Sequence, residues 1–196
     1  TDLFGLCMNN KFYFYGESKL VSVNMLLNPT VVSEFDSPIP HFVGSSMVEY
    51  PQTSKIYIMF GHIPGNYSND VWEFNTITNE WLKIDFSNNN NNNNIKPEAR
   101  CYQTAVLIDT NAILVFGGRR KKKYFNDIFV FHPDSNEWEQ IKASGTPQPR
   151  CMHSAVAVNK KMFVYGGANA NNVMNDIYMF DFKAKTWKAL YVNMDI

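Results

Sequence analysis

Cysteine is scarce in this 196-residue chain, with only Cys7, Cys101 and Cys151 and no CxxC spacing. An odd, widely spaced set argues against both a disulfide framework and a zinc site, and favours a reducing, intracellular and most simply cytoplasmic location. No apolar stretch reaches the roughly 18–20 residues needed to span a membrane, and the first ten residues contain no basic targeting region. We therefore expect no membrane contact.

Charged residues are also few, at 18%, and the formal net charge is zero. No overall field attracts nucleic acid, which is not an expected partner. The zero hides an asymmetry, because the five basic residues at 119–123 leave 13 basic against 18 acidic residues elsewhere, a net −5. Hydrophobic residues make up 45% and aromatic residues 15% of the chain, a composition typical of a β-rich globular domain.

Common catalytic motifs are missing as well. The sequence has no P-loop, HExxH or GxSxG motif. The stretches FGGRRK and YGGANA follow predicted strands without opening helices, so they do not suit phosphate binding. His41, His62, His132 and His153 do not lie at metal-ligand spacings within one element. We expect no catalytic residue, no metal and no cofactor.

The sequence does contain an internal repeat. The stretches 56–74, 113–131 and 162–180 each have an apolar run, glycine, an Asn-Asp pair and a second apolar run, and a tryptophan follows each aspartate by eleven residues. A run of seven asparagines lengthens the interval between the first two stretches. The repeated markers are Gly61, Asp70 and Trp81; Gly117, Gly118, Asp127 and Trp138; and Gly166, Gly167, Asp176 and Trp187.

The repeat has a lead-in and a weaker fourth copy. PRCMHSAVAV (149–158) matches ARCYQTAVLI (99–108) and, more loosely, PHFVGSSMV (40–48), while residues 4–35 repeat the pattern without the tryptophan. Cys101 and Cys151 share one repeat position, which predicts buried free thiols. His153 takes the position of Gln103, which predicts a hydrogen-bonding structural role for the imidazole.

Each copy predicts four short strands rich in Val, Ile, Phe and Tyr. Runs such as ILVF are apolar at consecutive positions, so both faces of each sheet must be buried. Repeated sheets of this kind predict an all-β fold, a partial β-propeller of about four four-stranded antiparallel blades in one domain over 1–196. The expected blades are 1–38 (incomplete), 39–86, 97–143 and 147–192, with an Asn-rich insertion at 87–95.

The order Arg-x-x-(His)-Ser, Gly-Gly, Asn-Asp and Trp at a spacing of about 50 residues resembles the kelch repeat. In the second copy His62 stands for the second glycine and His41 for the arginine. The glycines are expected to adopt positive φ or to allow close backbone approach. Asp127 and Asp176 are expected to accept hydrogen bonds from backbone amides, and the tryptophans to fill the wedges between blades.

The resemblance also implies a function. In a four-stranded meander, the loop between strands two and three and the loop entering strand one emerge on the same face, which often binds proteins in kelch domains. We expect a non-enzymatic scaffold whose partner is a protein, with an acidic one as the candidate. The candidate contact residues are Arg100, Arg119, Arg120, Lys121, Lys122, Lys123 and Arg150.

Several alternatives remain open. The basic run is also compatible with a solvated loop, or with a nuclear-import or nucleic-acid role, and Arg100 and Arg150 with structural hydrogen bonding. The chain is alternatively a regulatory segment of a larger enzyme, such as a kelch-containing Ser/Thr phosphatase or a ubiquitin-ligase adaptor. Copper chemistry resembling galactose oxidase needs clustered Tyr, His and Cys ligands, which are not apparent. Because kelch propellers have about five to seven blades, we expect further blades from a longer chain or a homo-oligomer.

Overall fold

The computed structural model describes residues 4–24, 31–86 and 95–191. It contains four four-stranded antiparallel sheets, each in sequence order. Their strands are β1 (Phe4–Met8), β2 (Lys11–Gly16), β3 (Lys19–Asn24) and β4 (Val31–Asp36); β5 (Ser46–Tyr50), β6 (Lys55–Ile63), β7 (Asn66–Asn75) and β8 (Glu80–Lys83); β9 (Thr104–Asp109), β10 (Ala112–Phe116), β13 (Ile128–His132) and β14 (Glu137–Ile141); and β15 (Ser154–Val158), β16 (Lys161–Ala168), β17 (Val173–Asp181) and β18 (Thr186–Tyr191). We call these sheets blades 1 to 4.

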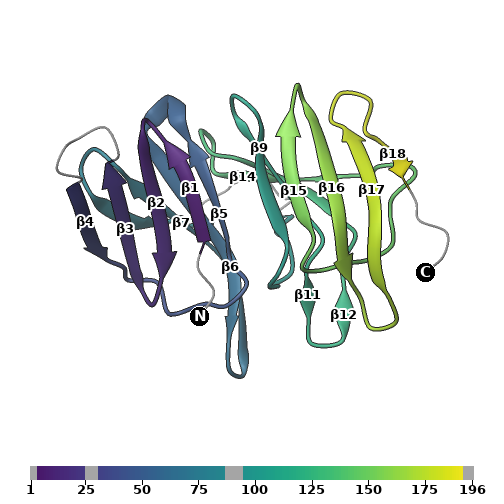
Figure 1. Cartoon of the computed structure of the whole chain (residues 1–196), viewed down its shortest axis with the longest axis horizontal. Helices are drawn as coiled ribbons and strands as arrows, with labels where there is room; N and C mark the ends of the chain where they lie inside the picture. Colours follow the sequence, from purple (N-terminus) through teal and green to yellow (C-terminus); the bar gives the residue numbers. More distant parts are fainter. Residues whose placement is uncertain (1–3, 25–30, 87–94, 192–196) are drawn as a thin grey trace.

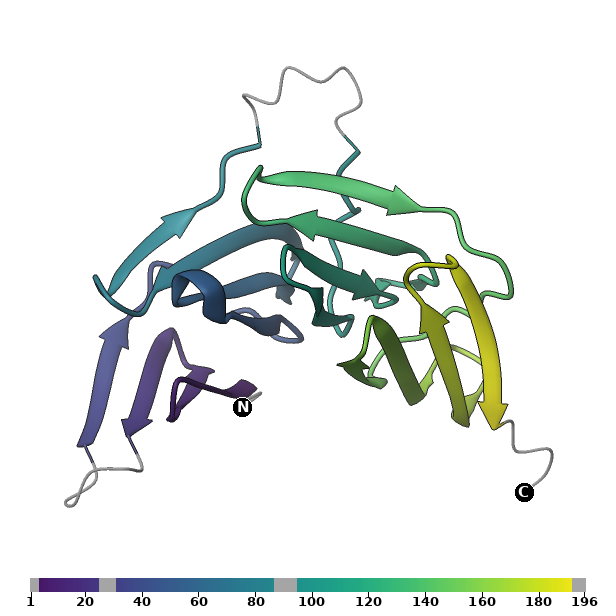
Figure 2. The same cartoon turned by 90° about the horizontal axis from the view of Figure 1, so that it is seen from above.

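The blades stand side by side along an arc (Figures 1 and 2). Their first strands, β1, β5, β9 and β15, contact one another in that order and therefore lie innermost. A short hairpin of β11 (Arg119–Arg120) and β12 (Lys123–Tyr124) extends from blade 3, and a 3-10 turn, Pro51–Thr53, precedes β6. Figure 2 shows the arc open between blades 1 and 4. The arrangement confirms the predicted all-β, partial propeller.

Apolar side chains fill the space between successive blades. All five residues of β10 are buried, so this strand contributes to the core on both of its sides. Ile113 and Val115 pack towards blade 2, whereas Leu114 and Phe116 pack towards blade 4. This is why the run reads as continuously apolar rather than alternating.

The tryptophans lie in these wedges, as predicted. Trp187 of blade 4 packs on Phe116 of blade 3 with 4.7 Å between ring centroids. Trp138 reaches Phe60 of blade 2 at 5.9 Å, and Trp81 reaches Tyr15 of blade 1 at 6.3 Å. Each indole therefore bridges to the preceding blade and buries a large apolar surface there.

In blade 2 the structural equivalents of the glycine pair lie one residue earlier than the alignment of the internal repeats predicted. Gly117 and Gly166 have φ values of 67° and 65°, and Phe60 occupies the same conformation at 62°. Gly61, with φ 113°, corresponds to the second glycine of the other blades. The assignment of His62 to that glycine was therefore wrong, because a non-glycine residue adopts the left-handed conformation at the first position. Of the predicted asparagine-rich insertion, 87–94 lie outside the described residues.

Candidate partner-binding face

The lead-ins and the loops between the second and third strands, which the sequence predicted to form a binding face, lie on one side of the molecule. Isolated bridges join the lead-ins of blades 2, 3 and 4 to residues at or just after the end of the second strand: Val43 to His62, Cys101 to Arg119, and Cys151 to Ala168. The loop that enters the first strand and the loop that follows the second strand therefore emerge on the same side, and we call this side the loop face. In Figure 1 the β6–β7, β11–β12 and β16–β17 hairpins point to the same edge.

The basic run forms an ordered hairpin on the loop face. Arg119 pairs with Tyr124 and Arg120 with Lys123 in antiparallel register. Arg120, Lys121, Lys122 and Lys123 are exposed. Arg119 is half-buried, and its guanidinium lies 5.3 Å from the centre of the Tyr102 ring.

Two contacts brace this hairpin against its neighbours. The Lys121 amide donates to the Tyr67 hydroxyl of blade 2 at 3.1 Å. Lys123 forms a salt bridge with Glu98, and this contact lowers the pKa of the Glu98 carboxyl. Within the described ranges, Arg120, Lys121 and Lys122 form no salt bridge.

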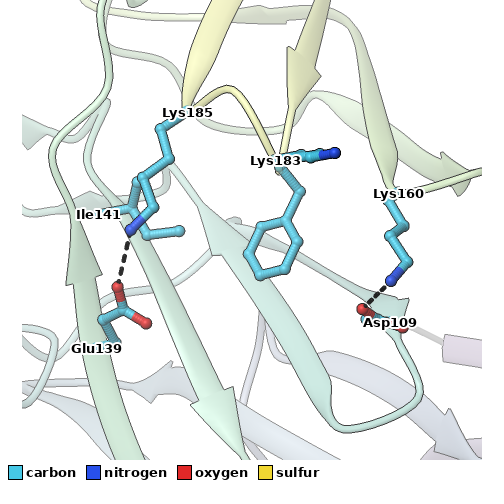
Figure 3. Close-up of a pocket in the computed structure, with 7 residues that line it drawn as sticks. Asp109, Glu139, Ile141, Lys160, Lys183 and Lys185 are labelled. Atoms are coloured by element: carbon cyan, nitrogen blue, oxygen red, sulfur yellow. Dashed lines mark hydrogen bonds and ion pairs between the residues drawn. The ribbon is translucent and has the colours of Figure 1, made fainter.

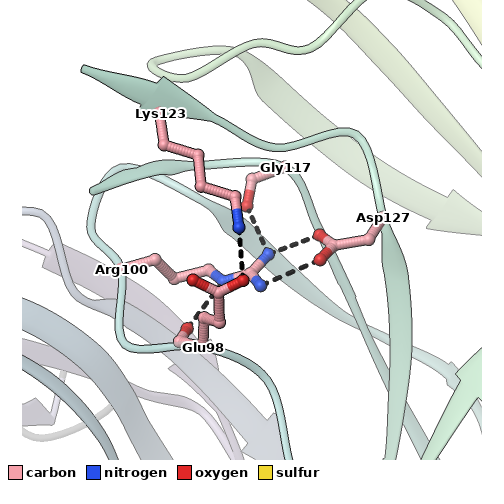
Figure 4. A network of polar contacts seen from close by, with 5 residues as sticks. All are labelled: Glu98, Arg100, Gly117, Lys123 and Asp127. Carbon is pink, nitrogen blue, oxygen red and sulfur yellow. Dashed lines mark hydrogen bonds and ion pairs between the residues drawn. The ribbon is translucent and has the colours of Figure 1, made fainter. Parts of the chain in front are cut away.

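Arg100 and Arg150 are not on the surface. Both side chains have 0% exposure, which contradicts their expected role in direct partner contact. Arg100 donates from Nη1 and Nη2 to the two Asp127 carboxylate oxygens at 2.5 and 3.0 Å, and from Nη1 to the Gly117 carbonyl at 3.0 Å (Figure 4). The burial of a charged side chain is explained by this full set of acceptors, including the Glu98 carbonyl that receives Nε.

Blade 4 repeats the same clamp. Arg150 donates to Asp176 at 2.5 and 2.9 Å and to the Gly166 carbonyl at 2.9 Å. Asp127 and Asp176 thus accept from arginine side chains, and their expected role as acceptors for backbone amides was wrong. In blades 3 and 4 a bidentate pair therefore joins the lead-in to the Asn-Asp pair of the same blade, because guanidinium and carboxylate match geometrically.

Blade 2 replaces the clamp with an apolar residue. Because Val43 corresponds to Cys101 and Cys151, the arginine position falls on Phe42, which is buried, and not on His41 as expected. Asp70 pairs instead with Lys83 on β8 at 3.0 Å. The lead-in therefore keeps the same bridge to its blade with either a charged pair or a packed ring at this position.

The asparagines of the first two Asn-Asp pairs reach the following blade. Asn69 donates through Nδ2 to the Pro97 carbonyl, and Asn126 to the Pro147 carbonyl, each at 3.0 Å. The aspartate thus holds its own blade's arginine in blades 3 and 4, while the asparagine holds the next blade's lead-in. The sequence repeat reveals the Asn-Asp pair, but no pattern in it predicts this division of roles between the two residues.

His153 has the predicted structural role. Its Nε2 lies 2.9 Å from Thr104 Oγ1 across the blade 3–4 boundary. Gln103 makes the corresponding contact one blade earlier, donating to Ser46 Oγ at 3.0 Å. Burial, with a contribution from Arg150, lowers the pKa of His153 to about 3, so the imidazole is neutral at physiological pH.

Cys101 and Cys151 are buried and form no disulfide within the described part of the chain, as predicted, whereas Cys7 is exposed. Burial raises the pKa of Cys151. The described residues include no group of three or more His, Cys, Asp or Glu side chains positioned to hold a metal ion. Nor do they contain a helix that is long and apolar enough to cross a membrane.

A cavity of about 270 Å³ lies between blades 3 and 4 at the end opposite the loop face (Figure 3). Ile141 and Phe182 provide its apolar lining. Salt bridges cross the seam, from Lys160 to Asp109 at 2.6 Å and from Lys185 to Glu139 at 3.3 Å. These contacts tie the two blades together, so the cavity belongs to an inter-blade seam.

Comparison with known proteins agrees with this geometry. The model of the KLHDC2/KLHL20/DRC7 Kelch-repeats domain matches residues 7–196. The structure of YjhT has a TM-score of 0.80 at 13% identity, covering 99% of this chain and 66% of YjhT. The chain is 29% identical over 126 residues to the Rho GTPase-activating protein gacHH of Dictyostelium discoideum, covering 63% of this chain and 8% of that protein.

Two further relatives show the same imbalance of length. The host cell factor homolog hcf-1 of Caenorhabditis elegans is 28% identical over 156 residues, which cover 70% of this chain and 19% of that protein. The flagellar outer-arm dynein alpha chain of Chlamydomonas reinhardtii is 27% identical over 100 residues, 49% of this chain and 2% of that protein. Together with the clamps, glycine pairs and wedged tryptophans, the family match shows that the chain belongs to the kelch-repeat family, whose domains generally serve as protein-interaction modules.

Proposed function

We propose that this domain binds an acidic surface of a partner protein or peptide through the β11–β12 hairpin. The observation that carries the proposal is the group of exposed cations at Arg120, Lys121 and Lys122, which have no salt bridge within the described part of the chain. The hairpin is braced by Tyr67 and Glu98. A braced hairpin loses less conformational entropy on binding than a free loop does.

The position of the hairpin also favours this function. It projects from the loop face, beside the β6–β7 and β16–β17 hairpins, so a partner can reach it without disturbing the inter-blade cores (Figure 1). The burial of Arg100 and Arg150 removes them from the proposed contact set. Arg119 remains in that set as a half-buried residue at the base of the hairpin.

Charge reversal of Lys121 and Lys122 to glutamate tests the proposal. The double change alters the local charge by about four units. At roughly 7 Å from a peptide carboxylate in screened water, this change should weaken the binding free energy by about 1 kcal/mol, which is about a fivefold loss of affinity. The measurement is fluorescence anisotropy with a labelled Asp- and Glu-rich peptide library, at low and high salt. Binding of the wild-type protein is expected to weaken as salt rises, whereas the double variant should show a smaller salt dependence.

Two controls make this test specific. Lys183→Glu with Lys185→Glu makes the same charge change at the opposite face, where Lys185 loses only an exposed pair with Glu139. An isosteric Asn- and Gln-rich library keeps peptide length and shape but removes the charge. Equal binding of both libraries, or equal loss in both double variants, would reject the acidic-surface proposal.

A second proposal is that the domain recruits partners for a larger protein whose activity lies elsewhere in the chain. It is favoured by the small share, 8% and 19%, of gacHH and hcf-1 that the matched segments cover. Mass spectrometry of the endogenous protein tests it, since an intact mass near 22.6 kDa would exclude further domains.

A further inference from the structure

The cavity between blades 3 and 4, at the end opposite the loop face, takes no part in the proposed partner site. Its volume of about 270 Å³ is below the roughly 300–1,000 Å³ of pockets for drug-sized ligands and above the roughly 150 Å³ that holds one benzene molecule. Ile141 is buried and Phe182 half-buried in its apolar lining. The cavity therefore has the size and the lining for a single aromatic side chain.

The charges around this cavity are not balanced. Lys160 and Lys185 each have a carboxylate partner, as described above. Lys183 lies between those two salt bridges (Figure 3) and is exposed, and within the described residues its ammonium group forms no salt bridge or hydrogen bond. The rim thus has three lysines against two carboxylates. It favours an occupant that brings a hydrogen-bond acceptor or a negative charge to Lys183.

The boundary between blades 2 and 3 shows how the corresponding space is filled from within the chain. Tyr50, the last residue of β5, is 3% exposed and belongs to the core between those two blades. Its hydroxyl donates across the boundary to Asp134 Oδ1 at 3.0 Å. A phenol from one blade therefore closes this seam against a polar side chain of the next blade.

The boundary between blades 3 and 4 has different residues at the same two positions. Ile108 of β9 has the repeat position of Tyr50, counted from the bridge of the lead-in, and Lys183 has that of Asp134, counted from the tryptophan of the fourth strand. Ile108 lies in the core between these blades, but it is shorter than tyrosine and has no polar atom to offer Lys183. This seam therefore lacks the phenol that closes the preceding one.

We propose that this cavity binds a tyrosine of a partner protein, in a segment where acidic residues flank that tyrosine. The ring packs against Ile141 and Phe182, and the phenol oxygen accepts a hydrogen bond from Lys183 Nζ. The bond runs in the opposite direction to that between Tyr50 and Asp134, because an ammonium group only donates. The flanking carboxylates face the lysine rim, which gives charge complementarity. Buried aromatic side chains of this kind commonly dominate the affinity of an interface.

The test is an NMR titration of the isotope-labelled protein with the peptide SGEEYDEGS. Saturable shifts are expected for the Phe182 and Lys183 amide signals. The peptide SGEEADEGS keeps the charge and should bind at least about tenfold more weakly, because the ring supplies most of the buried contact. The peptide SGKKYKKGS keeps the ring and should also bind more weakly, because its lysines meet the lysine rim.

Two variants take their design from the boundary between blades 2 and 3. Ile108→Tyr copies Tyr50 and places a phenol of the chain itself in the cavity, so the shifts caused by the peptide should disappear. Lys183→Asp copies Asp134 at an exposed position and leaves the fold intact. It should weaken binding of SGEEYDEGS by about fivefold or more and strengthen binding of SGKKYKKGS, because the new carboxylate repels acidic residues and accepts a hydrogen bond from the phenol.

Several outcomes would overturn the proposal. They are equal shifts with the tyrosine and alanine peptides, and peptide binding that Lys183→Asp leaves unchanged. Binding of N-acetyltyrosinamide as tight as that of SGEEYDEGS would assign the cavity to a free aromatic molecule and would also reject a partner segment. Should Ile108→Tyr not fold, the exchange of peptide preference in Lys183→Asp decides the matter.

The basic hairpin provides the last control. Lys121→Glu with Lys122→Glu should leave binding of SGEEYDEGS at the cavity unchanged, and loss of the Phe182 and Lys183 shifts in that variant would reject the cavity as the site. Failure of the tyrosine peptide to bind leaves the proposal for the loop face intact, because binding there is measured with hairpin substitutions.

Discussion

Substitution of Arg150 by methionine should destabilise the domain strongly. The change removes two hydrogen bonds to the Asp176 carboxylate, at 2.5 and 2.9 Å, and the donor to the Gly166 carbonyl at 2.9 Å. Breaking a buried ion pair costs about 3–5 kcal/mol when one charge is left behind. Because Asp176 keeps 16% exposure and some access to water, we expect the lower end, about 3 kcal/mol.

Urea unfolding at neutral pH, followed by tryptophan fluorescence, measures this loss. Domains of this kind have stabilities of about 5–15 kcal/mol, so the variant should remain folded in the absence of urea. A change below about 1 kcal/mol would refute the clamp as a structural element. Unchanged stability together with lost peptide binding would instead restore the partner-contact role that the burial of Arg150 contradicts.

Blade 2 offers a designed rescue. It places Phe42 at the arginine position and satisfies Asp70 with Lys83, which faces Trp72 in the β7–β8 register. The residue equivalent to Lys83 in blade 4 is Ala189, which faces Tyr178. Arg150→Phe combined with Ala189→Lys should recover about half of the lost stability, because the ring refills the volume and the lysine again pairs the carboxylate. Arg150→Phe alone should recover less.

Two further predictions concern pH and backbone conformation. The pKa of His153 is about 3 in the folded chain and about 6.5 when unfolded, so the unfolded state binds more protons between these values and stability falls as pH drops from 6.5 towards 3. The free energy of unfolding, measured by urea titration, should fall by about 2 kcal/mol between pH 7.5 and 5. His153→Gln, which copies Gln103, should remove this fall. An equal dependence of the unfolding free energy on pH in both proteins would contradict the prediction. Gly118→Ala should lower the free energy of unfolding by about 3 kcal/mol in thermal or urea unfolding, because φ is +98° and a Cβ would lie 2.9 Å from the Gln103 Cβ. Gly65→Ala, at φ +84° in open space, should lower it by only about 1 kcal/mol. Equal losses in the two variants would show that crowding of the Cβ is irrelevant.

Much of the fold followed from local sequence. The apolar run at 112–116 and the recurring tryptophans predicted sheets buried on both faces, and β10 with Trp138 and Trp187 has that environment. The structural role of His153 was also predictable, because Gln103 at the same repeat position is a hydrogen-bonding side chain. These inferences succeeded because strand formation and wedge filling depend on residue type and spacing.

The site was less predictable. Arg100 and Arg150 were expected on the rim, where the loops emerge, but each turns inward to an aspartate that follows 27 or 26 residues later in the chain. The one-residue error in blade 2 arose because Phe60 adopts a left-handed φ that sequence patterns assign to glycine. Neither outcome can be read from spacing, since each depends on which groups the folded backbone brings within hydrogen-bonding distance.

The amino-acid sequence by itself determined the repeat, the strands and the residues that fill the gaps between blades, because these follow from hydrophobicity and side-chain size along a short stretch. Only the tertiary structure decided which cations are buried in clamps and which remain available on the β11–β12 hairpin. That division depends on where the lead-ins of blades 3 and 4 cross their own blades, because a guanidinium there meets a carboxylate and a carbonyl at the same point.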